Sequence, residues 1–297
     1  MAASIGTLGQ LAIGDADPVT QRLNYTAEDF TRKDEVIDGN GIRGTRSQDS
    51  ELVMDGIQRI NGPVNLIPTA LEMSYLLQWI LGGAPTGSGT VTYPLADTIP
   101  TKFVTIDRRQ KVFTYAGVGV NTATFRASRG TPLSVELGLI GQTEAVGNSG
   151  TFPVLTLDVS TKPFVFHNLV LSVESTTVSC AEFMLSVSNM IDADRYFNSQ
   201  TLTAVNALDR EIRFGTSLPY GDYEAIRAAM NAGSGGLSVV ATFTVGNTAL
   251  VFTMPAVAVP MRAPGTPGRV EIMLPVEGRA YRLAGARELV TTLDHTP

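Results

Sequence analysis

The residue types that most often carry catalysis are sparse in this sequence. It contains two histidines, His167 and His295. His167 lies in FVFHNLV, an alternating run typical of a strand with the ring at the surface, and His295 lies three residues from the end. A Ser-His-Asp triad needs a base held rigidly beside its nucleophile, and neither histidine fits that role. We therefore expect no enzyme activity, and a hydrolase with an unrecognised site is the least favoured class.

Metal and cofactor motifs are equally weak. Asp192 and Asp194 form a D-x-D pair, but this spacing alone is also typical of a solvated loop, here with Arg195 beside it. Cys180 is the only cysteine, which excludes a disulfide within the chain and a cysteine zinc site. GVGVNT lacks the third glycine and the lysine of a phosphate loop. We expect no cofactor and no metal.

Composition places the chain among proteins with a sizeable core and few charges. It has 297 residues, 43% of them hydrophobic and 17% charged, with a net charge of −6. Average soluble domains carry about 25% charged residues, so the deficit indicates either surface hidden in an assembly or a β-rich fold. An acidic chain does not bind nucleic-acid backbones tightly, although DNA could slide past it. No apolar run is long enough to predict a membrane span.

Hydrophobic patterns predict strands and two helices. ELVMDGIQRINGP (residues 51–63) alternates, slips phase beside Gly56 as at a β-bulge, and is typical of an edge strand. Thr69 is the expected N-cap of a helix that ends at Gly82 and Gly83. KVFTYAGVGVNTATFRAS predicts two strands joined near Asn121, and TEAVGNSGTFP predicts a loop. A second helix is expected in PYGDYEAIRAAMNAGSGG, and a hairpin turn at Gly246 and Asn247.

These elements divide the chain into three parts. Residues 1–50 are rich in turn formers and predict an extended arm with little core of its own. Residues 51–150 and 151–297 each contain a strand, a helix ended by glycines, and hairpins, while the tail ELVTTLDHTP is expected to be peripheral. The shared order suggests an internal duplication, in which one chain supplies two equivalent units to a ring.

Charges of both signs alternate around the arm. Arg43, Arg46 and Arg59 are spaced among acidic residues rather than clustered with aromatic ones. Such interleaving favours a salt-bridged protein contact over a phosphate track. The alternative is a solvated loop whose ion pairs each contribute less than about 1 kcal/mol.

Several of these segments, taken in order, resemble a known family. GIRGTRSQDSELVMDGIQRINGPVNLIPTALEMSYLLQWILGG resembles the opening of phage tail tube proteins, also called major tail proteins, of long non-contractile tails. The hairpin pattern with Asp107, Tyr115, Gly117 and Val120, and the later LTAVNALDREI, resemble the same family. The resemblance runs from about residue 37 to the C-terminus, and the order of its short motifs carries it.

The resemblance implies a mainly β protein, a sandwich or barrel with one flanking helix per half. It implies a homo-oligomeric ring of six units, stacked into a tube for genome ejection in the virion tail and assembled in the host cytoplasm. Three chains complete the ring if each holds two units, and six if each holds one; we favour three because about 100–150 residues suffice for one domain. Implied partners are tail terminator, tape-measure and baseplate or tip proteins, with DNA passing unbound and no membrane.

On this basis we expect the arm to contact other subunits. Gly39, Gly41, Gly44 and Gly56 would let the backbone bend, the first three through positive φ, and Arg43, Arg46 and Arg59 would reach acidic groups on a neighbouring ring. The acidic balance predicts a negative bore that repels phosphate. The alternative is a carbohydrate- or receptor-binding β-protein of the tail tip, which the single tryptophan and scattered tyrosines disfavour.

Overall fold

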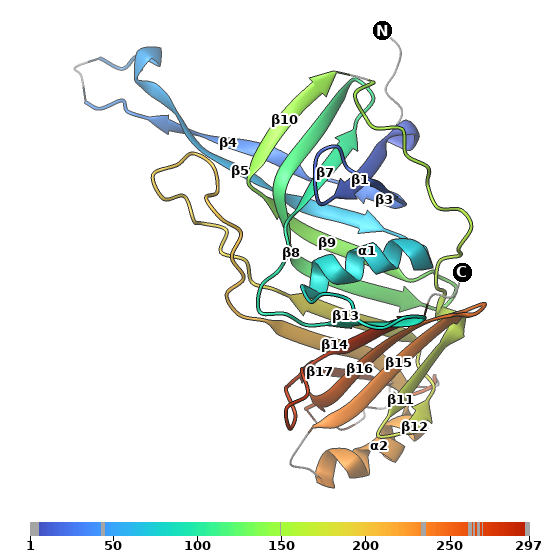
Figure 1. Cartoon of the computed structure of the whole chain (residues 1–297). Helices are drawn as coiled ribbons and strands as arrows, with labels where there is room; N and C mark the ends of the chain where they lie inside the picture. The colour runs from blue at the N-terminus through green and yellow to red at the C-terminus, as the bar shows by residue number, and fades with distance from the viewer. Residues whose placement is uncertain are drawn as a thin grey trace.

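The computed structural model describes residues 6–42, 45–148, 150–232, 236–260, 263, 265, 268 and 270–294. Strands dominate it and confirm the expectation of a mainly β fold with one α-helix in each half (Figure 1). The strands of the first half are β1 (Gln10–Gly14), β2 (Gln21–Leu23), β3 (Tyr25–Glu28), β4 (Thr31–Asp38), β5 (Val53–Leu66), β6 (Thr90–Pro94), β7 (Lys102–Asp107), β8 (Lys111–Ser128), β9 (Ser134–Gly141) and β10 (Thr143–Asn148). Those of the second half are β11 (Leu169–Val173), β12 (Thr176–Val178), β13 (Glu182–Ser188), β14 (Glu211–Pro219), β15 (Leu237–Val245), β16 (Thr248–Ala258), β17 (Met273–Ala280) and β18 (Val290–Asp294). The helices are α1 (Ala70–Leu81) and α2 (Tyr220–Ala232).

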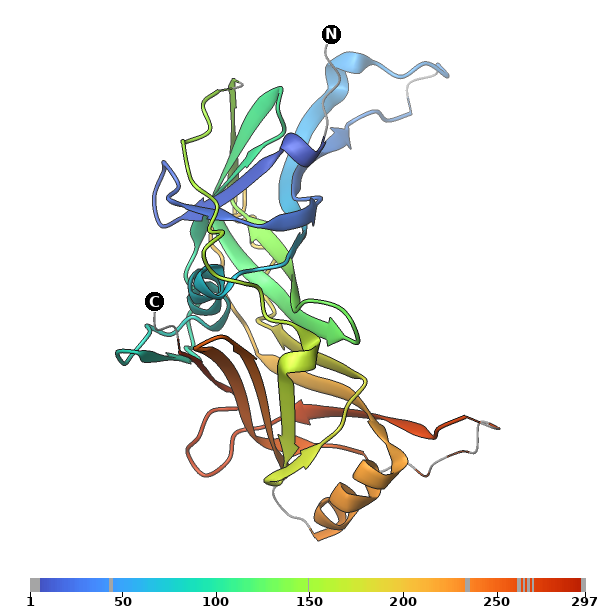
Figure 2. The ribbon, with the colours of Figure 1, turned by 90° about the vertical axis from the view of Figure 1, so that its right-hand side faces the viewer.

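One antiparallel sheet runs through both halves of the molecule. In this large sheet the strand order is β4–β5–β9–β8–β13–β14–β17, and β3 also pairs with β5. A first small sheet, β2–β1–β7–β8–β10, belongs to the first half of the chain. A second small sheet, β12–β11–β15–β16–β18–β6, belongs mainly to the second half. Figure 2 shows the two halves stacked along the long axis of the body, with α2 at one end.

The strand β8 joins the first small sheet to the large one. Its first part, 111–118, pairs with β7 and β10, and its second part, 119–128, pairs with β9 and β13. The predicted turn near Asn121 was therefore wrong. Register shifts interrupt the ladders on either side of Gly117 and of Asn121, and Gly117 has a φ of 62°. A bulge that contains a glycine with positive φ bends a strand without ending it. The single strand β8 can therefore belong to both sheets.

Alternating apolar residues fill the space between the layers with one continuous core. Phe125, Phe183, Phe214, Phe243 and Phe252 are buried there, and several of these rings contact one another edge to face or tilted. Because side chains alternate across a strand, the same pattern leaves one face of the large sheet polar. The core therefore fixes which face of that sheet is open.

The helix α1 begins and ends where the sequence predicts. Thr69 and Glu72 form a capping box, and Gly82 takes the left-handed conformation with a φ of 86°. α1 packs against β8, β6 and β2, and the indole of Trp79 donates a hydrogen bond to the carbonyl of Val118 at 3.1 Å. This bond fixes the helix at the residue where β8 passes from one sheet to the other.

Replacing Glu72 with alanine tests this cap. One carboxylate oxygen of Glu72 accepts from the Asn24 N–H at 2.7 Å and the other from the Thr69 N–H at 2.8 Å, and burial raises the pKa of Glu72. Glu72→Ala leaves both donors without this partner, so we expect the free energy of unfolding to fall by about 2–3 kcal/mol. Chemical denaturation measures it. Glu224→Ala on α2, which removes an exposed pair with Arg227 and a hydrogen bond with the exposed Tyr220, should change it by less than about 1 kcal/mol; equal losses would contradict the proposed cap.

The same set of strand pairings occurs twice in the chain. In the first half the pairs are β1–β2, β1–β7, β7–β8, β8–β9, β8–β10, β5–β9 and β4–β5. In the second half the corresponding pairs, in the same order, are β11–β12, β11–β15, β15–β16, β16–β17, β16–β18, β14–β17 and β13–β14. α1 follows β5 just as α2 follows β14. The two halves are thus two copies of one arrangement, joined by the pairing of β8 with β13.

Several expectations about the ends and edges of these elements were wrong. Leu11, Ile13, Leu23 and Phe30 are core residues, so residues 10–30 are not an arm without a core. The residues of TEAVGNSGTFP include strand β10, and the tail ELVTTLDHTP includes β18, which pairs with β16 and β6. β5 is an edge strand only over residues 53–59, where β4 is its one described strand partner; from Ile60 it pairs with β9 on one side and with β3 and β4 on the other.

Candidate assembly surfaces

A two-stranded ribbon projects from the body (Figure 1). It consists of β4 and the first part of β5, residues 53–59, with the connection 39–52 at its end. Over this length β5 pairs only with β4 among the described strands, because its pairing with β9 begins at Ile60. Apart from the hydrogen bonds of Gln58 and Asp55 with Gln200, the described residues leave the edges and faces of this ribbon open to other molecules.

Two of the predicted glycines are needed where ribbon backbones approach closely. Opposite Glu35 the register slips on β5, and a Cβ added to Gly56 would lie 2.9 Å from the Glu35 carbonyl oxygen. This confirms the bulge expected beside Gly56. A Cβ on Gly39 would lie 2.9 Å from the Leu52 carbonyl oxygen. Neither Gly39 nor Gly41 has a positive φ. The expectation that these two glycines bend the backbone through positive φ was therefore wrong, and nothing in the structure explains Gly41.

Apolar side chains are exposed along this ribbon. Ile37 and Met54 lie opposite each other with exposed fractions of 52% and 55%, and Ile42 is fully exposed. Val36, Leu52 and Val53 are also exposed. Contiguous exposed apolar residues on a soluble protein mark an interaction surface. The ribbon therefore has the composition of a contact between protein molecules.

Arg59 holds the base of the ribbon within its own chain. Its guanidinium pairs with Glu35 of β4 at 2.8 Å and with Asp194 at 2.7 Å, and it lies 5.5 Å from the centre of the Tyr196 ring. These hydrogen bonds, to Glu35 first and Asp194 second, raise the pKa of Arg59. The main-chain N–H of Gln58 also donates a hydrogen bond to the carbonyl oxygen of Gln200 at 2.7 Å. The connection 189–210 thus braces the ribbon, and a contact of Arg59 with another subunit stays a prediction.

Replacing Arg59 with alanine should loosen the ribbon without unfolding the body. The pairs with Glu35 and Asp194 are partly exposed, so we expect the free energy of unfolding to change by less than about 1 kcal/mol. Amide hydrogen exchange should become faster in 31–38 and 53–59, because these residues lose their link to the 189–210 connection. Arg32→Ala, which removes only a pair with Asp34 two residues away, is the matched control. Unchanged exchange in the Arg59 variant would contradict the bracing role.

Of the remaining predicted contact residues, the structure describes only Arg46, which lies in the connection at the end of the ribbon. Arg46 is exposed. Arg43 and Gly44 lie outside the described residues. The described candidate residues thus belong to one projecting element, with Arg59 at its base. The sequence analysis did not identify the 189–210 connection as the support of the ribbon, because Asp194 is far from Arg59 along the chain. The only sequence signal for Asp194 was its position in a loop between two strands.

The large sheet has an open face that is rich in small polar side chains. Thr124 lies opposite Ser186, with their hydroxyls 3.4 Å apart, and Ser186 lies opposite Arg213. Thr122, Ser128, Ser134, Ser188 and Ser217 lie on the same face, as alternation along their strands requires. The opposite face carries buried residues such as Phe125 and Leu185.

Charges on this open face are nearly balanced among the described residues. Over β9, β8, β13, β14 and β17 it carries the carboxylates Glu136, Glu182, Glu211 and Glu277 and the guanidiniums Arg126, Arg213 and Arg279. Glu211 pairs with Arg213 at 2.9 Å and lies 3.8 Å from Arg279. The net charge of −6 is therefore not concentrated here, so a strongly negative bore is not supported if this face lines it. The face offers neither a basic stripe that binds phosphate nor a strong repulsive field.

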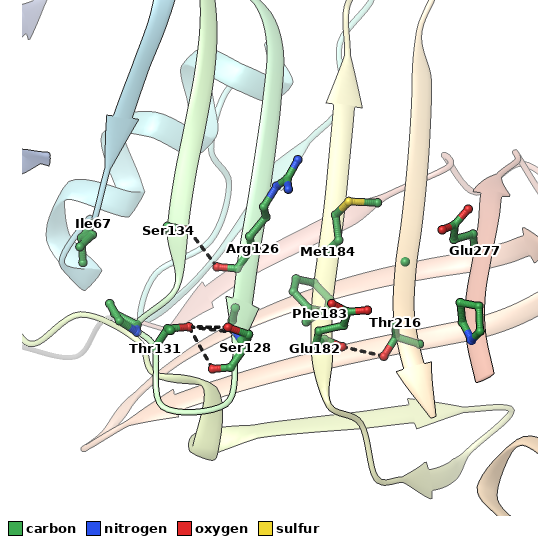
Figure 3. A pocket seen from close by; sticks show the side chains of 14 residues that line it. Ile67, Arg126, Ser128, Thr131, Ser134, Glu182, Phe183, Met184, Thr216 and Glu277 are labelled. Atoms are coloured by element: carbon green, nitrogen blue, oxygen red, sulfur yellow. Dashed lines mark hydrogen bonds between the residues drawn. The ribbon is translucent and has the colours of Figure 1, made fainter. Parts of the chain in front are cut away.

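A cavity of about 550 Å³ opens on this face where the two halves join. Figure 3 shows Arg126, Glu182, Met184 and Glu277 around it, from β8, β13 and β17. Gly215 of β14 contributes no side chain, and a Cβ there would lie 2.9 Å from the methyl carbon of Met184. The cavity is thus a hollow in the sheet surface above a glycine.

The residues considered for catalysis and metal binding are not assembled into a site in the part of the chain that the structure describes. The carboxylate of Asp194 forms an ion pair with Arg59. No group of three or more His, Cys, Asp or Glu side chains in that part of the chain is placed to hold a metal. His167 lies exposed in a short 3-10 turn, not in a strand, and His295 lies outside the described residues. Burial raises the pKa of the Cys180 thiol. Neither described helix is of a length and apolarity to cross a membrane.

Comparison with known proteins identifies the family. No curated protein matches the chain. The model of one protein family, described as phage tail tube protein, matches residues 3–280, which cover the first copy of the repeated arrangement and all of the second except β18. This agrees with a mainly β chain that has a projecting ribbon and an open polar sheet. The chain belongs to the phage tail tube protein family.

Proposed function

We propose that three copies of this chain close into a ring, and that rings stack into the tube through which viral DNA leaves a non-contractile tail. As a member of its family the chain is a structural subunit of a phage tail, and it assembles with other copies into a tube. The number of chains, the stacking contacts and the surface that faces the DNA are the new parts of the proposal.

The repeated strand pairings carry this proposal. β8 and β13 place two equivalent units side by side in one continuous sheet, so three chains supply six units, whereas six chains would supply twelve. We propose two tube units divided near residue 150, with residues 10–38 belonging to the first unit in place of a separate arm. A ring of six chains with one unit each would leave the second copy of the arrangement without a role.

We propose that the open face of the large sheet lines the channel. Its hydroxyl-rich and nearly charge-balanced surface supports this, because DNA can pass such a wall without being held through its phosphates. The ribbon would then reach the neighbouring ring with Ile37, Ile42 and Met54. Its exposed apolar residues support that role, since an apolar cluster gains stability when it is covered.

Other proteins would complete the tail. Terminator and baseplate or tip proteins would close the two ends of the tube, and a tape-measure protein would occupy the channel until ejection. Assembly would take place in the host cytoplasm. The exposed apolar residues of the ribbon support contacts with partners of this kind.

Gold-labelled antibody against this chain, applied to the phage particles that contain it, tests the proposal. A tube subunit should be labelled along the whole tail, because it repeats in every ring. A receptor- or carbohydrate-binding protein of the tip, the alternative function, should be labelled only at the end. Label confined to the tip would overturn the proposed function.

A further inference from the structure

The two units are connected along the chain by the segment between β10 and β11. It leaves β10 at Asn148 and reaches β11 at Leu169. Figure 1 shows this segment passing along one side of the body, from the first half to the second. Residues 150–157, called the linker below, are all described and contain no helix or strand. None of them is buried, so the linker is accessible to other molecules.

The chain is firmly held on both sides of the linker. Before it, β10 pairs with β8 over its whole length. After it, the carboxylate of Asp158 accepts hydrogen bonds from the Thr69 hydroxyl and from the Ser160 N–H, both at 2.9 Å. Phe164 is fully buried, and its carbonyl accepts from the Leu133 N–H at 2.8 Å. The anchors belong to the first unit, so both ends of the linker are fixed on the same body.

The linker itself makes few contacts with that body. The guanidinium of Arg22 donates a long hydrogen bond of 3.5 Å to the Leu155 carbonyl. Among the described residues, no main-chain hydrogen bond joins 152–157 to another part of the chain. Val154 is fully exposed. A cavity of about 550 Å³ is lined both by residues 152–155 and by the body residues Gln10, Asp107 and Arg109. The linker thus spans a hollow and is packed only loosely on the body.

A segment of this kind has the features of an endoprotease substrate. Exposed segments without regular structure are preferred sites of proteolytic cleavage. Extended peptides are recognised through free main-chain N–H and C=O groups and through pockets for their side chains. The linker offers free main-chain groups together with the apolar side chains of Val154, Leu155 and Leu157. It therefore suits an endoprotease that accepts an apolar residue beside the bond it cleaves.

The two units are held together by much more than the linker. β8 pairs with β13 over seven residue pairs, and β18 of the second half pairs with β6 of the first over five. The buried amide of Asn189 donates to the carbonyls of Ile80 at 3.1 Å and Val120 at 2.9 Å. The rings of Phe125 and Phe252, one from each half, lie 5.1 Å apart. The linker takes part in none of these contacts.

We propose that the linker is a site of endoprotease cleavage, and that a chain cut there remains one folded subunit made of two polypeptides. Cleavage consumes one water for each bond. The C–N bond breaks, the water oxygen joins the carbonyl carbon, and its proton goes to the nitrogen. The products are a new carboxylate and a new ammonium group, both in solvent, while the sheet and the core between the units stay intact.

Loss of the linker changes how the two units meet, and leaves the contacts between them unchanged. A short tether gives its two ends an effective concentration in the mM range, and a cut removes this advantage. Interfaces that resemble a domain core cut in half belong to permanent complexes. The two fragments should therefore stay paired at micromolar concentrations. Their unfolding temperature should rise with protein concentration, because unfolding now separates two molecules.

Limited proteolysis of the folded full-length chain tests the site. Thermolysin cleaves before apolar residues, and mass spectrometry of the denatured products should place cuts within residues 150–157. Native mass spectrometry of the same sample should show one particle with the mass of the intact chain plus one water for each cut. Fragments that separate under native conditions, or a linker that stays uncut until the chain unfolds, would overturn the proposal.

Leu155→Pro combined with Leu157→Pro is the matched control. Proline keeps the carbonyl that Arg22 contacts, and it removes an N–H that has no described partner and an apolar side chain. We expect loss of cleavage between residues 153 and 157 with an unchanged unfolding temperature. Equal cleavage there in both chains would mean that cutting follows a wider opening of the protein, and would overturn the site.

A third chain tests the pairing of the fragments separately from the choice of site. In it the recognition sequence of a site-specific protease replaces residues 151–157, none of which is buried. After complete cutting, the fragments should co-elute in size-exclusion chromatography and show the concentration-dependent unfolding described above. Separate elution at micromolar concentration would overturn the proposal. Neither part of it requires ring formation, so it stands or fails independently of the ring function.

Discussion

A chain in which residues 39–52 are replaced by the two-residue turn Asn-Gly is expected to fold and form rings but to produce no tubes. Asp38 and Val53 lie directly opposite each other, so a two-residue turn can connect them without changing the register. None of the described residues in 39–52 is buried, and the body should keep its stability. What is lost is the end of the ribbon with Ile42 and Leu52.

Negative-stain microscopy and thermal unfolding measure this effect together. A variant with a Gly-Ser segment of the same length in place of 39–52 is the matched control for length, and it should also fail to form tubes because it lacks the apolar side chains. Tubes of normal length from the shortened chain, with an unchanged unfolding temperature, would contradict a stacking role for the ribbon. Removing residues 1–50 altogether is a poorer experiment, since Leu11, Leu23 and Phe30 belong to the core.

The second large effect is expected when positive charge is added to the open face. In the proposed ring of three chains with the open face lining the channel, Thr124→Arg combined with Ser186→Arg would add six guanidiniums to the channel wall. Proteins that make 6–10 phosphate contacts lose about 10³–10⁵ in DNA affinity between 50 and 200 mM salt. We therefore expect assembled tubes of this variant to retain DNA at low salt, and to release it over a similar range as salt rises. Phage that carry it should eject DNA more slowly.

Filter retention of DNA by tubes across a salt series measures the change. Thr124→Gln combined with Ser186→Gln is the matched control, because glutamine is long and polar but uncharged. Both residues are only half-buried and face away from Phe125 and Leu185, so neither variant should unfold. If tubes of the arginine and glutamine variants retain the same amount of DNA at every salt concentration, the open face does not line the channel.

Local chemistry determines the parts of this fold that sequence could predict. The cap at Thr69, the left-handed Gly82 and the hairpin turn at Gly246 depend on residues within a few positions of one another, and all three were predicted correctly. The bulge at Gly56 was visible as a slip in alternation. Near Asn121 the same kind of signal was misread as a turn, because glycines mark both bulges and turns.

Long-range pairing determines the parts that sequence could not predict. Residues 10–23 read as turn-rich because β1 and β2 are short, and their burial depends on pairing with β7 far along the chain. The support of the ribbon depends on Arg59 meeting Asp194. The internal duplication was suggested by the order of elements, but the repeated strand pairings, such as β4–β5 and β13–β14, exist only in three dimensions.

The mass of a single ring tests the central claim most directly. The claim is that each chain supplies two of six equivalent units, and the chain has a mass of 31.6 kDa. Rings isolated from the ribbon-shortened variant, which should not stack, can be weighed one at a time by native mass spectrometry. The account predicts three chains per ring. A ring of six chains, or a chain that stays single at every concentration while intact tails contain it, would contradict the account.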